Sequence, residues 1–231
     1  MKSCSLSVLG FQVACSIAAL AAPSTVIPDP KPVAEAFCRA EYEGNDASAA
    51  EMVTISKVRQ AELRKAFHAK HPGEPLPIAD MIGGTFYSEP VLVVRSYRIV
   101  DQVGQGDTST AQVEYVVCGE FKSGKDDRCA TDFVAYDNKI QKEALKFRFS
   151  DGKNGMGWIR HTNWYVEDPP VPKVSVDALL RLCKKQLETF QGTAQRLKER
   201  GQAVPPNITW GNETYGRKVK SLESISALPA K

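Results

Sequence analysis

Apolar residues in the first third of the chain recur at helical spacings. Intervals of four and three predict a helix over residues 33–44, carried by Val33, Phe37 and Ala40. Intervals of three to five predict a second helix from about Ala47 to Ala69, which the following Pro72-Gly73 would end. We therefore expect two helices before any strand.

From residue 91 onward, apolar positions alternate with polar ones. This period of two predicts strands near residues 91–99, 113–121, 133–136, 145–149 and 158–166. Consecutive strands with one apolar face indicate an antiparallel meander that the preceding helices cover. The pattern therefore predicts an α+β fold in which N-terminal helices pack on a 4–5-stranded antiparallel sheet.

A further helix and an irregular segment follow the last expected strand. Ser175 is placed to cap a C-terminal helix over Val176–Phe190, whose apolar residues form one stripe. Residues 201–231 have no period and are rich in Pro, Gly, Ser and charge, which is typical of a flexible end. The expected units are a leader (1–22), a proline-rich segment (23–32), an α+β domain (33–170), an appended helix (171–200) and a flexible basic tail (201–231).

The first 22 residues have the pattern of a secretory signal peptide. Lys2 precedes a short apolar run, and Ala19-Leu20-Ala21-Ala22 supplies small residues for cleavage. The run is shorter than the roughly 20 apolar residues that span a bilayer. We expect cleavage after Ala21 or Ala22 and export to the bacterial periplasm or medium. A lipid on Cys15 and an uncleaved anchor are the alternatives.

Removal of the leader would leave four cysteines, at positions 38, 118, 129 and 183. An even number in an exported chain favours two disulfides. If strand 113–121 folds back about Ser123-Gly124, Cys118 lies opposite Cys129 and within disulfide reach. Cys38 would then pair with Cys183. Four free, buried thiols are the alternative.

The net charge of +3 is unevenly distributed. Residues 23–172 carry 18 Lys and Arg against 22 Asp and Glu, whereas residues 173–231 carry 11 against 5. No aromatic and basic platform accompanies the basic end, and an exported chain does not meet nucleic acid, so we expect no nucleic-acid partner. A weak contact with an anionic envelope surface stays open.

Three motifs resemble those of one superfamily. Residues 33–46 look like an opening helix that ends in a Gly-x-Asp turn. Gly106-Asp107 with Ala111 and Val113 resembles a "Gly-Asp-x-Ala-x-Val" strand start, and Asp151-Gly152 with Trp158 resembles a last hairpin. Over about residues 33–166 the chain is similar to the nuclear transport factor 2-like (cystatin-like) superfamily. The resemblance implies a strongly bent, cone-shaped sheet. Its members include ketosteroid isomerases, small dehydratases and many exported non-catalytic binding domains, so fold does not settle function.

Several aromatic residues fall on the expected strands. They are candidates for binding an apolar or amphipathic ligand inside a partly open cone, and their alternative role is hydrophobic core. The ligand-binding candidates are Tyr97, Tyr115, Phe147, Trp158 and Trp164.

Basic residues also alternate along the strands. Lys146 and Arg148, with Arg98 nearby, would form a basic stripe on the other face of the sheet. Such a stripe is either a solvated surface or a docking site for an anionic protein, headgroup or glycan.

Catalytic candidates are few. His161 shares a strand face with Asn163 and Tyr165, but the opposite parity of Trp158 and Trp164 indicates that His161 faces the solvent. No catalytic residue of the isomerases matches a position here, metal-binding motifs are absent, and we expect no cofactor.

The sequence favours an exported, non-catalytic binding or interaction domain of the bacterial envelope. Its partner would be a protein or a small amphipathic ligand, and an inhibitor, immunity or envelope-assembly role would fit. The alternative is a small lyase or isomerase that uses His161 with an acidic or Tyr partner.

Overall fold

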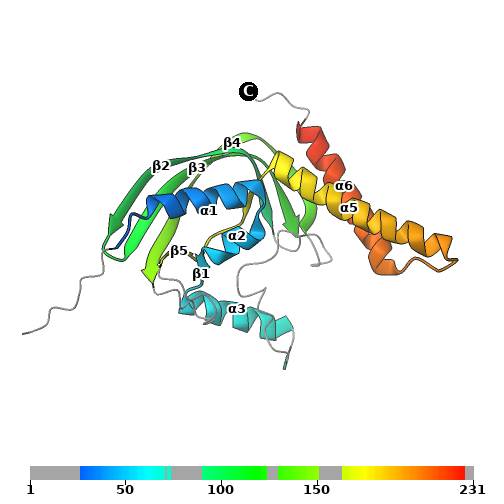
Figure 1. The fold of residues 1–231 in the computed structure, drawn as a ribbon, viewed down its shortest axis with the longest axis horizontal. Helices are drawn as coiled ribbons and strands as arrows, with labels where there is room; N and C mark the ends of the chain where they lie inside the picture. Colours follow the sequence, from blue (N-terminus) through cyan, green and yellow to red (C-terminus); the bar gives the residue numbers. More distant parts are fainter. Residues whose placement is uncertain (1–26, 71, 74–89, 124–129, 151–162, 227–231) are drawn as a thin grey trace, which may run out of the picture.

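A curled six-stranded sheet organises the chain, with strand order β1-β5-β4-β3-β2-β6 (Figure 1). The computed structural model describes residues 27–70, 72–73, 90–123, 130–150 and 163–226. Strands β2 to β5 pair antiparallel, as expected, whereas β1 with β5 and β2 with β6 pair parallel. The strands are β1 (Val53–Thr54), β2 (Val91–Gln105), β3 (Thr108–Ser123), β4 (Ala130–Ser150), β5 (Asn163–Glu167) and β6 (Lys173–Ser175).

The first predicted helix is confirmed as α1 (Lys31–Glu43), which lies under the arch of the sheet (Figure 1). Gly44 ends α1 with a left-handed backbone, φ 69°. A Cβ at this position would lie 2.8 Å from the Leu182 side chain, so the site favours glycine by conformation and by space. The α+β class, with N-terminal helices packed on a bent sheet, is confirmed.

The second predicted helix is divided in two. The structure has α2 (Asp46–Glu51), the short strand β1, and then α3 (Lys57–Lys70). The strand forms because the backbone between the helices bonds to the last antiparallel strand: Val166 N donates to Met52 O at 2.8 Å. Ser56 Oγ then accepts from Arg59 N and starts α3. Pairing with a distant strand overrides the local helical spacing.

The strands predicted at 133–136 and 145–149 are one continuous strand, β4. Asn138, two residues after the end of the first predicted strand, adopts φ 46° within β4. A register shift between Val117 and Gly119 of β3 accommodates the extra residues. Arg95 Nε donates to Asn138 Oδ1 at 2.9 Å and holds the irregular point in place.

Two hydrophobic cores lie on opposite faces of the sheet. The inner core fills the space between α1 and β2 to β5, around Phe37, Tyr115 and Phe147. The outer core joins one end of the sheet to α5 (Val176–Glu199) and α6 (Pro206–Ser226). The predicted cap of α5 is confirmed, because Ser175 Oγ accepts from Ala178 N at 3.1 Å.

The expected flexible tail is wrong over residues 206–226, which form α6 packed along α5 (Figure 1). Phe190 of α5 stacks on Tyr215 of α6 with ring centroids 5.7 Å apart. A Cβ at Gly211 would lie 2.5 Å from the Phe190 ring, so this glycine permits the close approach. Leu222 and Ile225 are also buried and complete the contact with the outer core.

The register between β3 and β4 differs from the one behind the expected Cys118–Cys129 disulfide. Gly119 pairs with Ala135 and Val117 with Lys139, so Cys118 lies opposite residues 136–138 of β4. Cys118 is a free thiol that donates to Val93 O at 3.3 Å. Cys129 lies outside the described residues.

The expected Cys38–Cys183 disulfide is wrong. Cys38 is a free thiol of the inner core, whereas Cys183 belongs to the outer core on the other face of the sheet. The described helices include none that is long and apolar enough to cross a membrane.

Candidate functional site

The aromatic ligand candidates that the structure describes are packing residues of the inner core. Tyr115, Phe147 and Trp164 are each 2% exposed. Tyr97 is half-buried, and its ring lies between those of Tyr42 and Tyr115, with centroid distances of 5.3 and 6.5 Å. These side chains fill the concave face of the sheet under α1. Trp158 and His161 lie outside the described residues.

A buried ion pair lies beneath α1, and sequence reasoning missed it. The Lys173 ammonium is 2.8 and 2.7 Å from the two carboxylate oxygens of Glu143 and lies 5.4 Å from the centre of the Tyr115 ring. Lys173 is 1% exposed. A buried lysine ammonium needs an acidic partner, because burying the charge without one destabilises the fold by roughly several kcal/mol.

Glu41 of α1 adds a second buried carboxyl to this group. Burial raises its pKa to about 8, with further raising by Glu143 and Asp46 and lowering by Lys173. Its Oε2 has no hydrogen-bond partner among the described residues. Below that pH Glu41 is uncharged, which leaves Lys173 to balance the single charge of Glu143.

Two other polar groups near Glu41 are also held neutral. Burial raises the pKa of the Cys38 thiol to about 12 and raises that of the Tyr115 hydroxyl above its usual range. A thiol with such a pKa is a poor nucleophile. Glu41, Cys38 and Tyr115 are therefore buried, neutral groups, whereas Glu143 is partly exposed and also lines a groove.

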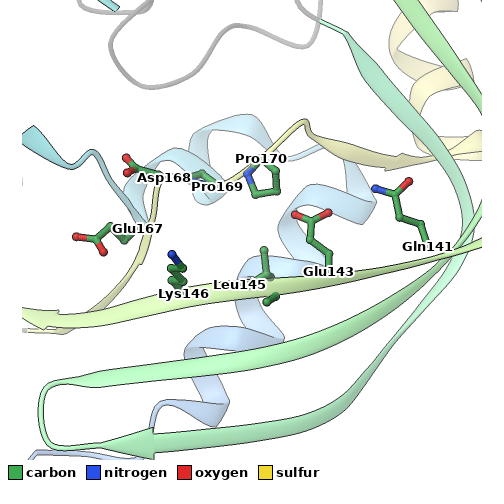
Figure 2. A pocket seen from close by; sticks show the side chains of 9 residues that line it. Gln141, Glu143, Leu145, Lys146, Glu167, Asp168, Pro169 and Pro170 are labelled. Atoms are coloured by element: carbon green, nitrogen blue, oxygen red, sulfur yellow. The ribbon is translucent and has the colours of Figure 1, made fainter. Parts of the chain in front are cut away.

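A groove lies on the other side of Glu143, between β4 and the segment that follows β5 (Figure 2). Its volume is about 370 Å³. Figure 2 shows the side chains of Gln141 and Glu143 directed toward the same space as Pro170. The groove is lined by Gln141, Glu143, Ala144, Leu145, Lys146, Glu167, Asp168, Pro169 and Pro170.

The predicted basic stripe lies on the outer face of the sheet, by which we mean the face of β2 to β5 turned away from α1. Arg98 and Lys142 both bind Glu114, at 2.6 and 3.0 Å, and their hydrogen bonds lower the pKa of that carboxyl. Arg148 binds Glu167 at 3.0 Å.

Lys146 completes this face. It is exposed and has no ion pair among the described residues. Four cations of this face, Arg98, Lys142, Lys146 and Arg148, are matched by only two carboxylates, those of Glu114 and Glu167. The exposed carboxylates of Asp101 and Asp168 lie at the borders of this surface, on β2 and directly after β5, so the excess of positive charge is confined to β3 to β5. Sequence reasoning found Arg98, Lys146 and Arg148 from their alternation. It missed Lys142 and the carboxylates of Glu114 and Glu167, whose contacts depend on the strand register.

Metal chemistry finds no support in the described part of the chain, where no three His, Cys, Asp or Glu side chains gather closely enough to hold an ion.

Comparison with known families and with curated proteins finds no match. One solved structure is similar, described as a "Putative NTF2-like transpeptidase" from Campylobacter jejuni. It is 14% identical, covers 62% of this chain and all of its own, and has a TM-score of 0.28. A similarity of this size carries no argument about the chemistry of this chain.

Proposed function

We propose that this chain is an exported, non-catalytic binding domain of the bacterial envelope that docks an acidic protein partner on the outer face of β3, β4 and β5. The observation that carries the proposal is the charge balance of that face. Arg98 and Lys142 share Glu114, and Lys146 has no ion pair among the described residues. Complementary charge of this kind steers association and fixes orientation.

The interior of the sheet supports a protein partner better than a small amphipathic ligand. Tyr115, Phe147 and Trp164 are used in packing against α1 and against the segment before it, where Trp164 Nε1 donates to Pro28 O at 2.7 Å. The groove beside β4 is lined mostly by polar and charged side chains. An apolar ligand would find little matching surface there.

The layout also fits the cone-shaped nuclear transport factor 2-like superfamily, which includes exported binding domains. Two of the three motifs behind that resemblance lie at a helix end and at a hairpin: Gly44 ends α1, and Gly106 turns β2 into β3 with φ 60°. The alternative, a lyase or isomerase that uses His161, depends on a residue outside the described part of the chain.

Partner retention tests this proposal. The purified chain would be immobilised and exposed to a native envelope extract of its host. We expect one stoichiometric protein to be retained by the wild type and lost with Lys146→Glu, because the substitution reverses the unbalanced charge. Lys185→Glu, on an exposed part of α5, is the matched control and should retain it. A wild type that retains no partner, or a Lys146→Glu variant that retains it fully, would contradict the proposal.

A further inference from the structure

The edge of β4 between Lys139 and Leu145 is unpaired among the described strands. β5 pairs only with residues 146–150 of β4, and β1 lies beyond β5. At the other end, the irregular backbone at Asn138 separates this stretch from the part of β4 near α6. The backbone groups of such an edge are ready to pair with another chain, and native proteins blunt or cover exposed edges for that reason.

The register identifies which backbone groups face the open edge. Phe149 N donates to Asp107 O at 2.8 Å, and the pairing of β3 with β4 runs without interruption from Arg148 to Lys139. Alternate residues of an antiparallel strand direct their N–H and C=O groups to opposite neighbours. Odd-numbered residues of this stretch therefore bond to β3, and the even-numbered Ile140, Lys142 and Ala144 present theirs to the edge.

The sequence after β5 explains why the chain does not cover this edge itself. Lys146 pairs with Glu167, so continuation of β5 would place Pro169 opposite Ala144. Proline has no N–H to donate there. Asp168 has φ 49° and its N donates to Thr54 O at 3.0 Å, which turns the chain away from β4. The groove of about 370 Å³ lies between β4 and the diverging segment (Figure 2).

Resting on the proposed function, we infer that the acidic partner binds by adding an extended strand to β4 at Ile140, Lys142 and Ala144. Residues directly opposite each other in a sheet share a face, so every second side chain of the added strand would lie on the outer face. Carboxylates at those positions would lie beside Lys142. The Lys142 ammonium is 3.0 Å from the Glu114 carboxylate on the neighbouring strand β3 and would lie between the two acidic groups. The intervening side chains of the added strand would enter the groove.

The charged residues that line the groove indicate which side chains of the partner segment can enter it. Glu143 is bound by the buried Lys173 and Glu167 by Arg148, so these groups are already balanced. The two charged groups of the lining that have no ion pair among the described residues, Lys146 and Asp168, have opposite signs, so the groove favours neither an acidic nor a basic side chain. The segment that fits is extended and alternates acidic residues with small, uncharged ones, and main-chain hydrogen bonds supply its affinity.

Amide hydrogen exchange of the full chain, followed by NMR, tests this inference. The probe is an acetylated, amidated heptapeptide of alternating Thr and Glu, and its control alternates Thr and Gln. We expect the Glu peptide to slow exchange at Ile140, Lys142 and Ala144 and to leave Gln141 and Glu143 unchanged, because the latter already bond to β3. The Gln peptide should bind more weakly.

Ala144→Pro removes one edge-facing N–H and no bond to β3, and Ala144→Ser retains that N–H. Loss of the hydrogen bond should weaken peptide binding about tenfold in the proline variant, with the serine variant equal to wild type. Equal binding by both variants, no peptide binding to wild type, or amides already protected in the free protein would overturn the inference.

Protection that rises with protein concentration before peptide is added would assign the edge to a second copy and would overturn the inference too. If partner retention still depends on Lys146 in any of these cases, the proposed function stands and only the mode of binding is wrong.

Discussion

Glu41 shows how a single buried carboxyl sets a pH dependence. Its pKa is raised to about 8 from an ordinary 4.5, chiefly by burial, and Lys173, Glu143 and Asp46 are the charged groups that act on it. Between these values the folded chain holds a proton that the unfolded chain has released. The stability that this proton contributes is therefore complete at low pH and is lost as the pH rises through about 8.

Glu41→Gln should remove that dependence, because the amide keeps the shape of the protonated acid and does not ionise. The free energy of unfolding of the wild type should fall relative to the variant between mildly acidic and mildly alkaline pH, by at most about 1.4 kcal/mol per pH unit. Urea unfolding of both proteins across that range measures the difference. Parallel pH profiles would show that Glu41 does not titrate as described.

At the scale of elements, the N-cap of α5 contributes to the free energy of unfolding through one hydrogen bond. Ser175 Oγ is the acceptor for Ala178 N, and the residue is buried where β6 passes into the helix. Ser175→Ala should lower the free energy of unfolding by about 1 kcal/mol. Ser175→Thr keeps an acceptor oxygen and should lose less. Denaturant titration compares the three, and an alanine variant as stable as the wild type would exclude a capping role.

The contact between α5 and α6 depends on one glycine. Gly211→Ala would force the new methyl group against the Phe190 ring and should cost about 1–3 kcal/mol. Gly216 of the same helix has open space at its Cβ, so Gly216→Ala should instead stabilise by about 0.5–1 kcal/mol through helix propensity. Thermal unfolding should show a lower Tm for Gly211→Ala and a higher Tm for Gly216→Ala than for the wild type. A neutral Gly211→Ala would mean that the two helices lie farther apart.

Local signals in the sequence predicted those elements whose ends are decided locally. Gly44 ends α1 and Ser175 begins α5, because backbone conformation and capping act within one turn. Local signals failed where contacts with distant parts of the chain determine the secondary structure. β1 exists through its pairing with β5, and α6 through the surface that Phe190 offers. Neither contact can be predicted from the neighbouring residues in the sequence.

The candidate site was predicted in the same partial way. Alternation along β4 was enough to place Lys146 and Arg148 on one face with Arg98. The carboxylates that bind them, and the open edge beside them, depend on the register of three strands. A register error, such as the one that set Cys118 opposite Cys129, changes every cross-strand neighbour, whereas alternate residues within one strand still share a face.

At the scale of the whole molecule, the two faces of the sheet serve different purposes. α1 and α2 close the inner face over a core that contains the Lys173–Glu143 ion pair. α5 and α6 cover one end of the outer face and leave the charged part of β3 to β5 exposed (Figure 1). Eight of the eleven basic residues of 173–231 lie in α5 and α6, so they are separate from the proposed docking face.

The central claim is that charge on the outer face of β3 to β5 holds an acidic partner. The most direct test is the salt dependence of Kd for the retained partner, by titration calorimetry, with wild type and Lys146→Glu. We expect wild-type Kd to rise steeply as ionic strength goes from about 0.05 to about 0.3 M, because exposed charges are screened within about 10 Å, and the variant to bind weakly with a shallower dependence. Equal affinities and equal salt dependence for the two proteins would contradict the claim.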